Sequence, residues 1–334
     1  MPASRDKDAL DIKKDAAYNN LNNVRLMSSY SSCHLCPRNC GVDRLHGETG
    51  VCGATATLTL GRAALHWWEE PCLVGEQGSG AVFFSFCSLH CIYCQNHDLS
   101  YGEGVQISSQ RLAEIFLELQ NVQHAANINL VTPGHYIPSI VQALVQAKNQ
   151  GLCIPIVYNT SGYESVESLK LLDGLIDIYL SDFKYVSPEL SQLLSSARDY
   201  PKRAYEALKE MDRQIQGSFD FDDQGLLKHG IIVRHLVLPH HVEESKRVIK
   251  HVHERFGNRV RFSIMNQFTP LAKSGDLSAY GLNEVLSESE YEEVLCFADD
   301  LGVEDYFWQE IGTCKESFIP FFDGTGVISS YVRK

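Results

Sequence analysis

The sequence lacks any long apolar run, any long basic run and any excess of positive charge. No stretch of its 334 residues approaches the roughly 18 to 20 apolar residues of a membrane-spanning helix, so we expect no membrane span. Residues 1–15 lack the apolar core of a signal peptide, and we therefore expect a cytoplasmic protein. Lysine and arginine together number 29 against 42 aspartates and glutamates, a formal charge of −13, which disfavours nucleic acid as the main partner.

Cysteine, in contrast, is abundant and clustered. Eight of the 11 cysteines lie between Cys33 and Cys94. In a reducing compartment, clustered cysteines favour metal or redox centres over structural disulfides. The hydrophobic content of 44% over this length is ordinary for a folded protein of one large or two small domains. The sequence therefore predicts a globular protein with thiol-bound metal or redox chemistry.

A Cys-x3-Cys-x2-Cys triplet follows an apolar run at residues 81–86 and consists of Cys87, Cys91 and Cys94. Its position predicts three thiolates on one short loop that leaves a strand. Ferredoxin-type clusters and structural zinc sites use four protein ligands, whereas three ligands leave one iron open for a substrate or cofactor. The alternatives are three buried cysteines that pack as small hydrophobic side chains, or a zinc knuckle.

The spacing of this triplet, with Tyr93 directly before the third cysteine, resembles that of the radical S-adenosylmethionine (SAM) superfamily. The resemblance implies that Cys87, Cys91 and Cys94 are catalytic and hold a [4Fe-4S] cluster, and that Tyr93 contributes to cofactor binding. It also implies that the open iron binds SAM, and that an external donor such as flavodoxin or ferredoxin supplies one electron. SAM is then cleaved to methionine and a 5'-deoxyadenosyl radical, which abstracts a hydrogen atom from the substrate.

A second group of cysteines lies upstream in a glycine-rich segment. We predict that it binds a structural zinc ion or an auxiliary iron-sulfur cluster, and the spacing alone does not choose the metal. His34 or His46 could replace one ligand. The alternative is unligated thiols or a regulatory disulfide. The four predicted ligands are Cys33, Cys36, Cys40 and Cys52.

From Ala81 onward, apolar runs alternate with helical patterns, which indicates βα units around a parallel sheet. The resemblance implies that this α/β fold is a partial (β/α)6 TIM-type barrel with chemistry at the carboxyl ends of the strands. The predicted strands are residues 81–86, 127–132, 153–159, 176–182, 231–238 and 261–267. The predicted helices are residues 109–122, 136–150, 165–172, 188–216, 242–256 and 284–300.

The domain organisation follows from these patterns. We predict a flexible tail or loosely docked helix, then the cysteine-rich segment, then the barrel, and finally a helix with a closing segment. The corresponding ranges are 1–30, 31–75, 76–275 and 276–334.

Polar residues follow the second and third predicted strands. Thr132 stands where relatives commonly have a Gly-Gly-Glu motif that contacts the SAM amino group, so Thr132 is a candidate contact without the usual carboxylate. His135 nearby is either a substrate-facing proton donor or a packing residue. The run Asn159-Thr160-Ser161 resembles a strand-end motif of glycyl-radical-enzyme activases. Asn159 stands where the activases have an acidic residue that helps to hold a monovalent cation, so whether this protein binds that cation stays open. Ser161 is a candidate hydrogen-bond partner of the SAM ribose.

The fourth and fifth predicted strands supply charged candidates. Asp182 and Lys184 match the Asp-x-Lys motif of the activases, and residues i and i+2 of a strand share a face. The resemblance implies that Lys184 neutralises the SAM carboxylate, while an exposed ion pair is the alternative. Arg234 is a candidate to bind ribose or carboxylate oxygens.

The resemblance extends over about residues 33–325 and is nearest to the pyruvate formate-lyase activating enzyme-like (PflX-type) proteins. It implies an oxidoreductase that abstracts hydrogen from a protein or peptide, as an activating enzyme does. Two alternatives remain open. The same radical chemistry could act on a small metabolite or an RNA base, or the protein could transfer electrons or sense redox state without turning over SAM.

Overall fold

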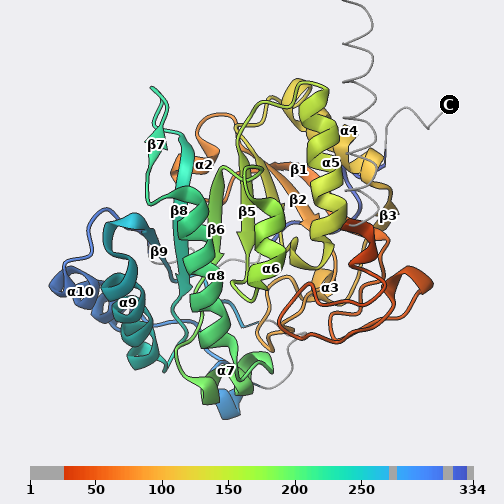
Figure 1. The fold of residues 1–334 in the computed structure, drawn as a ribbon. Helices are drawn as coiled ribbons and strands as arrows, with labels where there is room; N and C mark the ends of the chain where they lie inside the picture. Colours follow the sequence, from red (N-terminus) through yellow and green to blue (C-terminus); the bar gives the residue numbers. More distant parts are fainter. Residues whose placement is uncertain (1–25, 271–276, 311–318, 329–334) are drawn as a thin grey trace, which may run out of the picture.

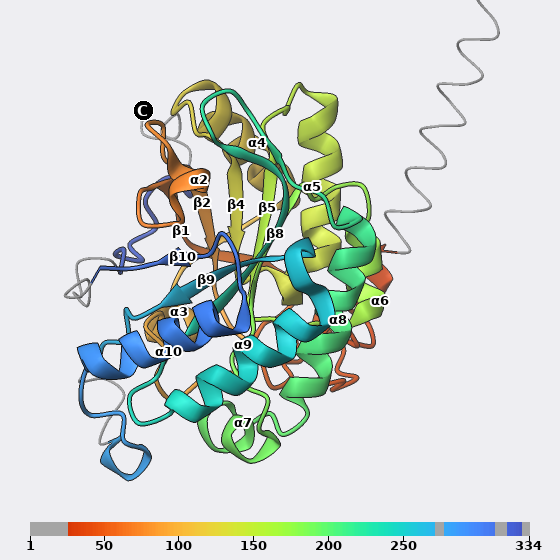
Figure 2. The ribbon, with the colours of Figure 1, turned by 90° about the vertical axis from the view of Figure 1, so that its left-hand side faces the viewer.

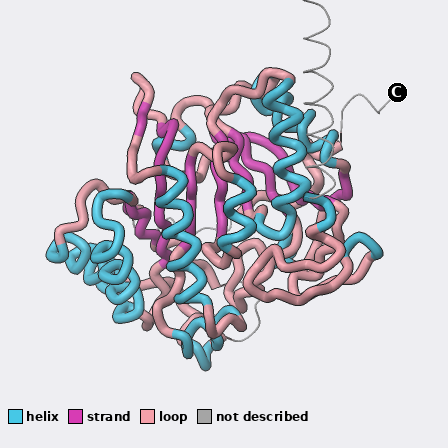
Figure 3. The backbone as a smooth tube through the Cα atoms, in the orientation of Figure 1, coloured by secondary structure: helices cyan, strands magenta, loops and turns pink. Residues whose placement is uncertain are grey.

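The structure is a computed structural model, and it describes residues 26–270, 277–310 and 319–328. These residues form an α/β fold around one large sheet, as Figure 1 and Figure 3 show. Most of the tail that we predicted for residues 1–30 lies outside the described residues. No helix within the described ranges combines the length and the apolar character that crossing a membrane requires.

Most of the sheet is parallel, with antiparallel strands at one edge. Its order is β10-β9-β8-β6-β5-β4-β2-β1-β3, and β7 lies off this path and pairs with β8. The edge strands β3 and β10 do not pair with each other in the described residues, so the predicted α/β class is confirmed but the sheet is not closed. The strands are β1 (Leu58–His66), β2 (Ser79–Phe84), β3 (Val105–Ile107), β4 (Ile128–Val131), β5 (Ile156–Thr160), β6 (Ile178–Asp182), β7 (Asp220–Phe221), β8 (Leu227–Leu236), β9 (Arg261–Met265) and β10 (Phe307–Trp308).

The six predicted strands are all present, with shifted ends, as β2, β4, β5, β6, β8 and β9. Prediction missed β1, which pairs antiparallel with β2, so the sheet begins inside the range 31–75 that we assigned to the cysteine-rich segment. Gly61 weakens the strand pattern of β1. In the structure a Cβ atom at this position would lie 2.5 Å from a methyl carbon of Leu99, so a larger residue would force the Leu99 side chain to move.

Helices pack along the outer face of the sheet, and α9 and α10 lie side by side near β9 (Figure 2). Several have sequence-encoded starts: Ser108 caps α4 by accepting from the Arg111 amide, and Ser287 with Glu290 forms a capping box at α10. The helices are α2 (Pro71–Val74), α3 (His97–Ser100), α4 (Ser109–Asn121), α5 (Ile137–Asn149), α6 (Val166–Leu169), α7 (Pro188–Ser195), α8 (Tyr200–Ile215), α9 (Val242–Phe256) and α10 (Glu288–Leu301).

The prediction of one helix over residues 188–216 is wrong, because the structure has α7 and α8 there. Ser196 ends α7 in the left-handed conformation, with φ of 49°. Pro201 then occupies the first turn of α8. Amide groups in the first turn of a helix have no helical acceptor, so the missing amide hydrogen of proline costs no hydrogen bond there. The break matters for the site, because it places the end of α7 beside the cysteine triplet.

The two faces of the sheet are occupied differently along its strands. Outward side chains such as Leu130 join the large core beneath the helices. Inward side chains at the start of the strands, such as Val157 and Ile178, pack against Cys72 and Leu73 of α2. Because side chains alternate along a strand, Asn159 and Asp182 share this inner face and lie nearer the carboxyl ends than Val157 and Leu180. The inner face therefore remains open only at the carboxyl end of the strands.

Candidate active site at the carboxyl ends of the strands

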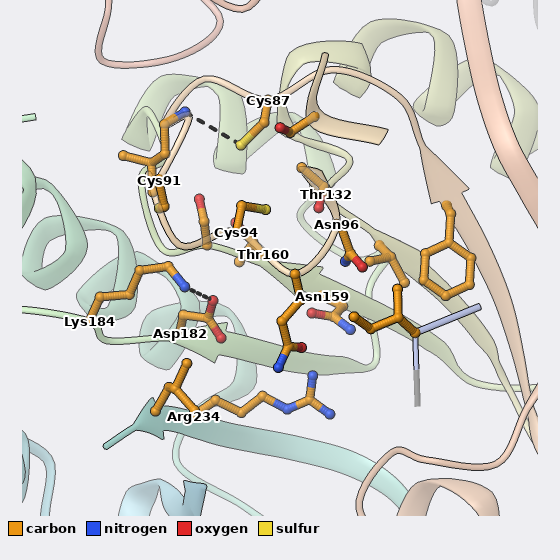
Figure 4. A pocket seen from close by; sticks show the side chains of 18 of the residues that line it. Cys87, Cys91, Cys94, Asn96, Thr132, Asn159, Thr160, Asp182, Lys184 and Arg234 are labelled. Carbon is orange, nitrogen blue, oxygen red and sulfur yellow. Dashed lines mark hydrogen bonds and ion pairs between the residues drawn. The ribbon is translucent and has the colours of Figure 1, made fainter. Parts of the chain in front are cut away.

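A cavity of about 230 Å³ opens at this end of the sheet (Figure 4). Its walls come from the inward residues of the parallel strands, from the cysteine loop and from the segment after β1. The predicted site residues that line it are Cys87, Cys91, Cys94, Tyr93, Thr132, Asn159, Ser161, Asp182, Lys184 and Arg234. The structure thus brings the predicted triplet and the predicted strand-end residues into one pocket.

The cysteine loop leaves β2 through two tight turns. Phe86 and His90 both have positive φ, of 76° and 53°, which is uncommon for residues with a side chain. The Phe86 amide donates to the Leu99 carbonyl at 2.7 Å, and the ring packs against Gly53 and Gly102, where a Cβ atom would crowd it. Packing from both sides therefore stabilises the turn that starts the loop.

Two of the three sulfurs in the triplet accept hydrogen bonds. The Leu89 amide donates to Cys87 Sγ at 3.4 Å, and the Ser195 hydroxyl donates to Cys91 Sγ at 3.0 Å. Burial raises the pKa of Cys87 and raises the pKa of Cys94 to about 12. Without a bound cation these thiols stay protonated at neutral pH. A metal centre bound here would displace these protons, because thiolates and not thiols are the ligands.

A chain of hydroxyl groups extends from the pocket wall to the triplet. The Tyr93 and Tyr185 hydroxyls are hydrogen-bonded at 2.5 Å, and the Tyr185 hydroxyl is hydrogen-bonded to that of Ser195 at 2.9 Å. Ser195 in turn donates to Cys91. Tyr93, the aromatic residue of the triplet motif, is thus connected to the sulfur of Cys91 through two side chains that the sequence analysis did not identify.

Asp182 and Lys184 form an ion pair in the pocket wall. Lys184 Nζ lies 2.5 Å from Asp182 Oδ2, and the two side chains are 17% and 22% exposed, so the alternative of an exposed surface pair is wrong. Burial opposes the charge on Lys184, but the Asp182 carboxylate and then Cys91 raise the pKa of Lys184 well above its usual value. An ammonium group therefore faces the same pocket as the three sulfurs.

Arg234 lines the pocket, but its guanidinium is already bound by two carboxylates that prediction missed. Glu70 accepts from Nε at 2.7 Å and from Nη2 at 2.6 Å, and Glu69 also accepts from Nη2. Burial opposes ionisation of Glu70, yet Arg234 lowers its pKa below the usual range. A ligand must compete with both carboxylates for Arg234. No sequence signal marks this pairing, which spans 164 residues or more.

A buried carboxyl group, also missed by prediction, lies behind the ends of β4 and β5. The Thr160 hydroxyl donates to Glu164 Oε1 at 2.5 Å, and both carboxyl oxygens lie where a Cβ atom on Gly134 would be. Burial raises the pKa of Glu164 to about 7. His135 is not among the lining residues. It is 3% exposed and donates to the Ser85 carbonyl, and burial lowers its pKa to about 3, so it is a neutral packing residue.

The upstream cysteine segment packs directly on the triplet loop, and its red and orange ribbon lies at the lower right of Figure 1. Arg38 donates from Nε to the Ser88 carbonyl at 2.8 Å and from Nη2 to the Ser195 carbonyl at 3.2 Å. His90 Nε2 donates to the Val51 carbonyl at 3.0 Å. The two cysteine groups that the sequence separates are therefore neighbours in space.

The two candidate replacement ligands of the upstream segment have other partners. His34 Nδ1 is hydrogen-bonded to Asn39 Oδ1 at 2.5 Å, and the 82% exposed side chain of His46 binds Asp43 at 2.7 Å. In the part of the chain that the structure describes, no three His, Cys, Asp or Glu side chains surround one point as ligands of a single metal ion would.

Comparison with known proteins gives a distant sequence relative. No protein-family model matches the chain. A curated protein of Methanocaldococcus jannaschii, described as uncharacterized protein MJ0674, is 27% identical over 306 residues, which are 88% of this chain and 80% of that protein. Its description names no activity, so this relation assigns none.

Among solved structures, two crystal structures of Streptococcus suis SuiB align with part of the chain. The structure bound to the precursor peptide SuiA has a TM-score of 0.46 and 14% identity, over 67% of this chain and 46% of SuiB. The structure bound to S-adenosylmethionine has a TM-score of 0.46 and 13% identity, over 68% of this chain and 48% of SuiB. The chain thus spans less than half the length of SuiB. Scores of this size establish neither a shared fold nor a shared activity.

Proposed function

We propose that this protein is a radical SAM enzyme whose [4Fe-4S] cluster is held by Cys87, Cys91 and Cys94. The observation that carries this proposal is the position of all three cysteines in the wall of one pocket, together with the Lys184 ammonium. Three thiolates leave one iron without a protein ligand, and the pocket offers space beside it. When bound, the cluster and SAM supply reductive cleavage to a 5'-deoxyadenosyl radical that abstracts hydrogen.

The pocket residues have separate roles in this proposal. Lys184 neutralises the carboxylate of SAM, and Asp182 fixes the position of the ammonium group. Thr132, Asn159 and Ser161 line the same wall and supply uncharged hydrogen-bonding groups for the amino acid and ribose parts of SAM. Asn159 is 9% exposed and the Lys184 and Asp182 side chains are 17% and 22% exposed, and this burial strengthens their electrostatic interactions.

Arg234 acts through its partners rather than by binding SAM itself. Its guanidinium neutralises Glu69 and Glu70 and so holds Glu69, which lines the pocket, in one position. Glu69 Oε1 also accepts from the Asn129 side chain at 2.8 Å. Arg234 and Asn129 thus hold the Glu69 carboxylate in the pocket, whereas the strand-end motif at Thr132 supplies no carboxylate.

We further propose a partial (β/α)6 barrel of the radical SAM type and a protein or peptide substrate, as in the activating enzymes. The open carboxyl end of the sheet and Trp68, which lines the pocket and is 56% exposed, suit a macromolecular substrate. An external electron donor of the flavodoxin or ferredoxin kind would reduce the cluster. The formal charge of −13 weighs against RNA, the second candidate substrate.

The test is anaerobic incubation with SAM and dithionite, followed by chromatography of 5'-deoxyadenosine. The wild type should form this product, and Cys91→Ala should form none. Cys153→Ala is the matched control, because Cys153 is exposed and does not line the pocket. Continued product formation by Cys91→Ala would contradict the proposal. A cluster that can be reduced, but whose spectrum does not change when SAM is added, would instead favour an electron-transfer or sensing protein.

A further inference from the structure

Arg44, in the upstream cysteine segment, is a fully buried cation. Its side chain is among the largest in the core and is 1% exposed. Nη1 donates to the His135 carbonyl at 2.7 Å, and Nη2 donates to the Thr55 carbonyl at 2.6 Å. The guanidinium also lies over the ring of Tyr30, 4.7 Å from its centroid. All of these partners are neutral.

Carbonyl groups and aromatic faces do not provide a full compensating charge for a buried guanidinium. No carboxylate in the ranges that the structure describes forms an ion pair with Arg44; the ionisable side chains that contact its guanidinium include Tyr30, through its ring, and Cys33, through Sγ. The Tyr30 hydroxyl is hydrogen-bonded to Ser139 and is buried, which keeps it neutral. The remaining candidate anions are the sulfurs, and Cys33 Sγ lies 3.7 Å from Nη1.

Three of the four upstream cysteines are buried in the folded loop, and Cys40 is half-exposed. Cys33, Cys36 and Cys52 are 4%, 8% and 6% exposed. The sulfur of Cys40 occupies the place where a Cβ atom on Gly50 would be, which brings Cys40 against the segment that leads to Cys52. The Gly41 amide donates to the Cys33 carbonyl at 2.9 Å and closes the loop around the first ligands.

We infer that Cys33, Cys36, Cys40 and Cys52 bind a metal centre through four thiolates, and that Arg44 is the counter-charge of this centre. Four thiolates around one zinc ion, or around a [4Fe-4S] cluster in its common oxidised state, carry two net negative charges, so either group suits an enclosed cation. Binding displaces the four thiol protons to solvent. This inference does not rest on the proposed radical chemistry.

The centre would also support the neighbouring pocket. Arg38 lies between Cys36 and Cys40 and binds the carbonyl groups of Ser88 and Ser195. Ser88 belongs to the triplet loop, and Ser195 donates to Cys91. Metal at the upstream segment therefore holds the Arg38 backbone in the conformation that positions both groups. A structural role of this kind requires permanent occupation of the site.

The experiment measures iron, zinc and sulfide in the full chain, purified without oxygen, as wild type and as Cys87→Ala/Cys91→Ala/Cys94→Ala. Retention of about four irons with sulfide in the triple variant identifies a second cluster. Retention of one zinc identifies a zinc site. X-ray absorption of the triple variant should show sulfur neighbours alone as protein ligands. A triple variant that retains neither metal overturns the inference, provided that it folds.

Two further variants test the role of Arg44. Arg44→Met should release the upstream metal to a chelator roughly tenfold faster or more, while Arg44→Lys should recover part of the difference. Cys72→Ala is the control, since Cys72 is equally buried but packs against Leu73 at the other end of the strands. Equal release from wild type and Arg44→Met overturns the role of Arg44.

A measurement on the wild type avoids the risk that variants misfold. Iodoacetamide should label the exposed Cys153 at once and leave the upstream cysteines unlabelled until a chelator removes the metal, as mass spectrometry of the peptides would show. Because Cys40 is half-exposed, it is the most informative of the four. Chelator-independent labelling of Cys40 would overturn its assignment as a ligand.

Discussion

The two cysteine groups differ in the surroundings of the cationic side chain that lies near each one. The triplet lies in the wall of an open pocket, and its nearby cation, Lys184, is already paired with Asp182. The upstream group is enclosed, and its cation, Arg44, has neutral neighbours apart from the sulfurs. A cation that shares an open pocket with a carboxylate can also bind an anionic group from outside. An enclosed cation without a carboxylate matches a permanent internal anion.

The largest expected effect separates the two groups by activity. Lys184→Met should lower 5'-deoxyadenosine formation by about 10²-fold or more, because SAM loses the ammonium group that neutralises its carboxylate. The upstream metal content should not change. Lys170→Met is the control, since Lys170 forms an exposed pair with Glu167. Equal activity of Lys184→Met and Lys170→Met would show that Lys184 does not contact SAM.

The next effect concerns the stability of the pocket wall. Arg234→Leu leaves Glu69 and Glu70 buried without a counter-charge and should lower the free energy of unfolding by about 3 to 5 kcal/mol. Urea denaturation followed by circular dichroism measures the change. Arg198→Leu breaks an ion pair that is 64% and 70% exposed and should change stability by about 1 kcal/mol or less. Similar values for both variants would mean that the buried charges find other partners.

Glu164, which lies behind the ends of β4 and β5, gives a pH-dependent effect. Its pKa is raised from 4.5 to about 7, so the folded state holds a proton that the unfolded state has already lost. The protonated carboxyl group therefore contributes to the free energy of unfolding in full below about pH 4.5. This contribution, about 3 kcal/mol, is lost as the pH rises to about 7. The stability difference between wild type and Glu164→Gln should fall by that amount between pH 4.5 and 7.5. Parallel pH profiles would contradict the assignment.

The smallest effect tests the connection between the two groups. Ser195→Ala removes the hydroxyl that donates to Cys91 Sγ, so the reduction potential of the proposed cluster should shift to a more negative value. Anaerobic redox titration followed by electron paramagnetic resonance measures the shift. Tyr185→Phe keeps the Ser195 hydroxyl and should shift the potential less. If the Ser195→Ala potential equals that of the wild type, this hydrogen bond does not tune the cluster.

The sequence predicted the parts of the pocket that follow local patterns. Runs of apolar residues marked the six parallel strands, and the polar residues at their ends, such as Asn159 and Asp182, share the inner face because side chains alternate. The triplet was recognisable because its three ligands lie within eight residues. Residues that a strand end or a short loop places could therefore be predicted from their neighbours.

The parts that depend on distant contacts could not be predicted. The sequence suggested that Arg234 is free to bind a ligand. Its partners Glu69 and Glu70 lie 165 and 164 residues away in the sequence, and no local pattern indicates the pairing. Glu164 resembled an ordinary acidic residue after a strand, and only the packing of Gly134 against it shows that it is buried. The break at Ser196 was missed although Pro201 is a sequence signal for it, because a proline disfavours a continuous helix and marks the first turn of a new one.

The Arg38 contacts also constrain how the protein is made. They join the upstream segment to Ser195 and Ser196, which lie 157 and 158 residues later in the chain. During synthesis, the upstream cysteines leave the ribosome long before these partners exist. The upstream loop also needs contacts with His135 and Ser139, which are synthesised before α7, whereas the triplet loop reaches its final shape only after α7 has been synthesised. The final shape of the triplet loop is therefore a late step in folding.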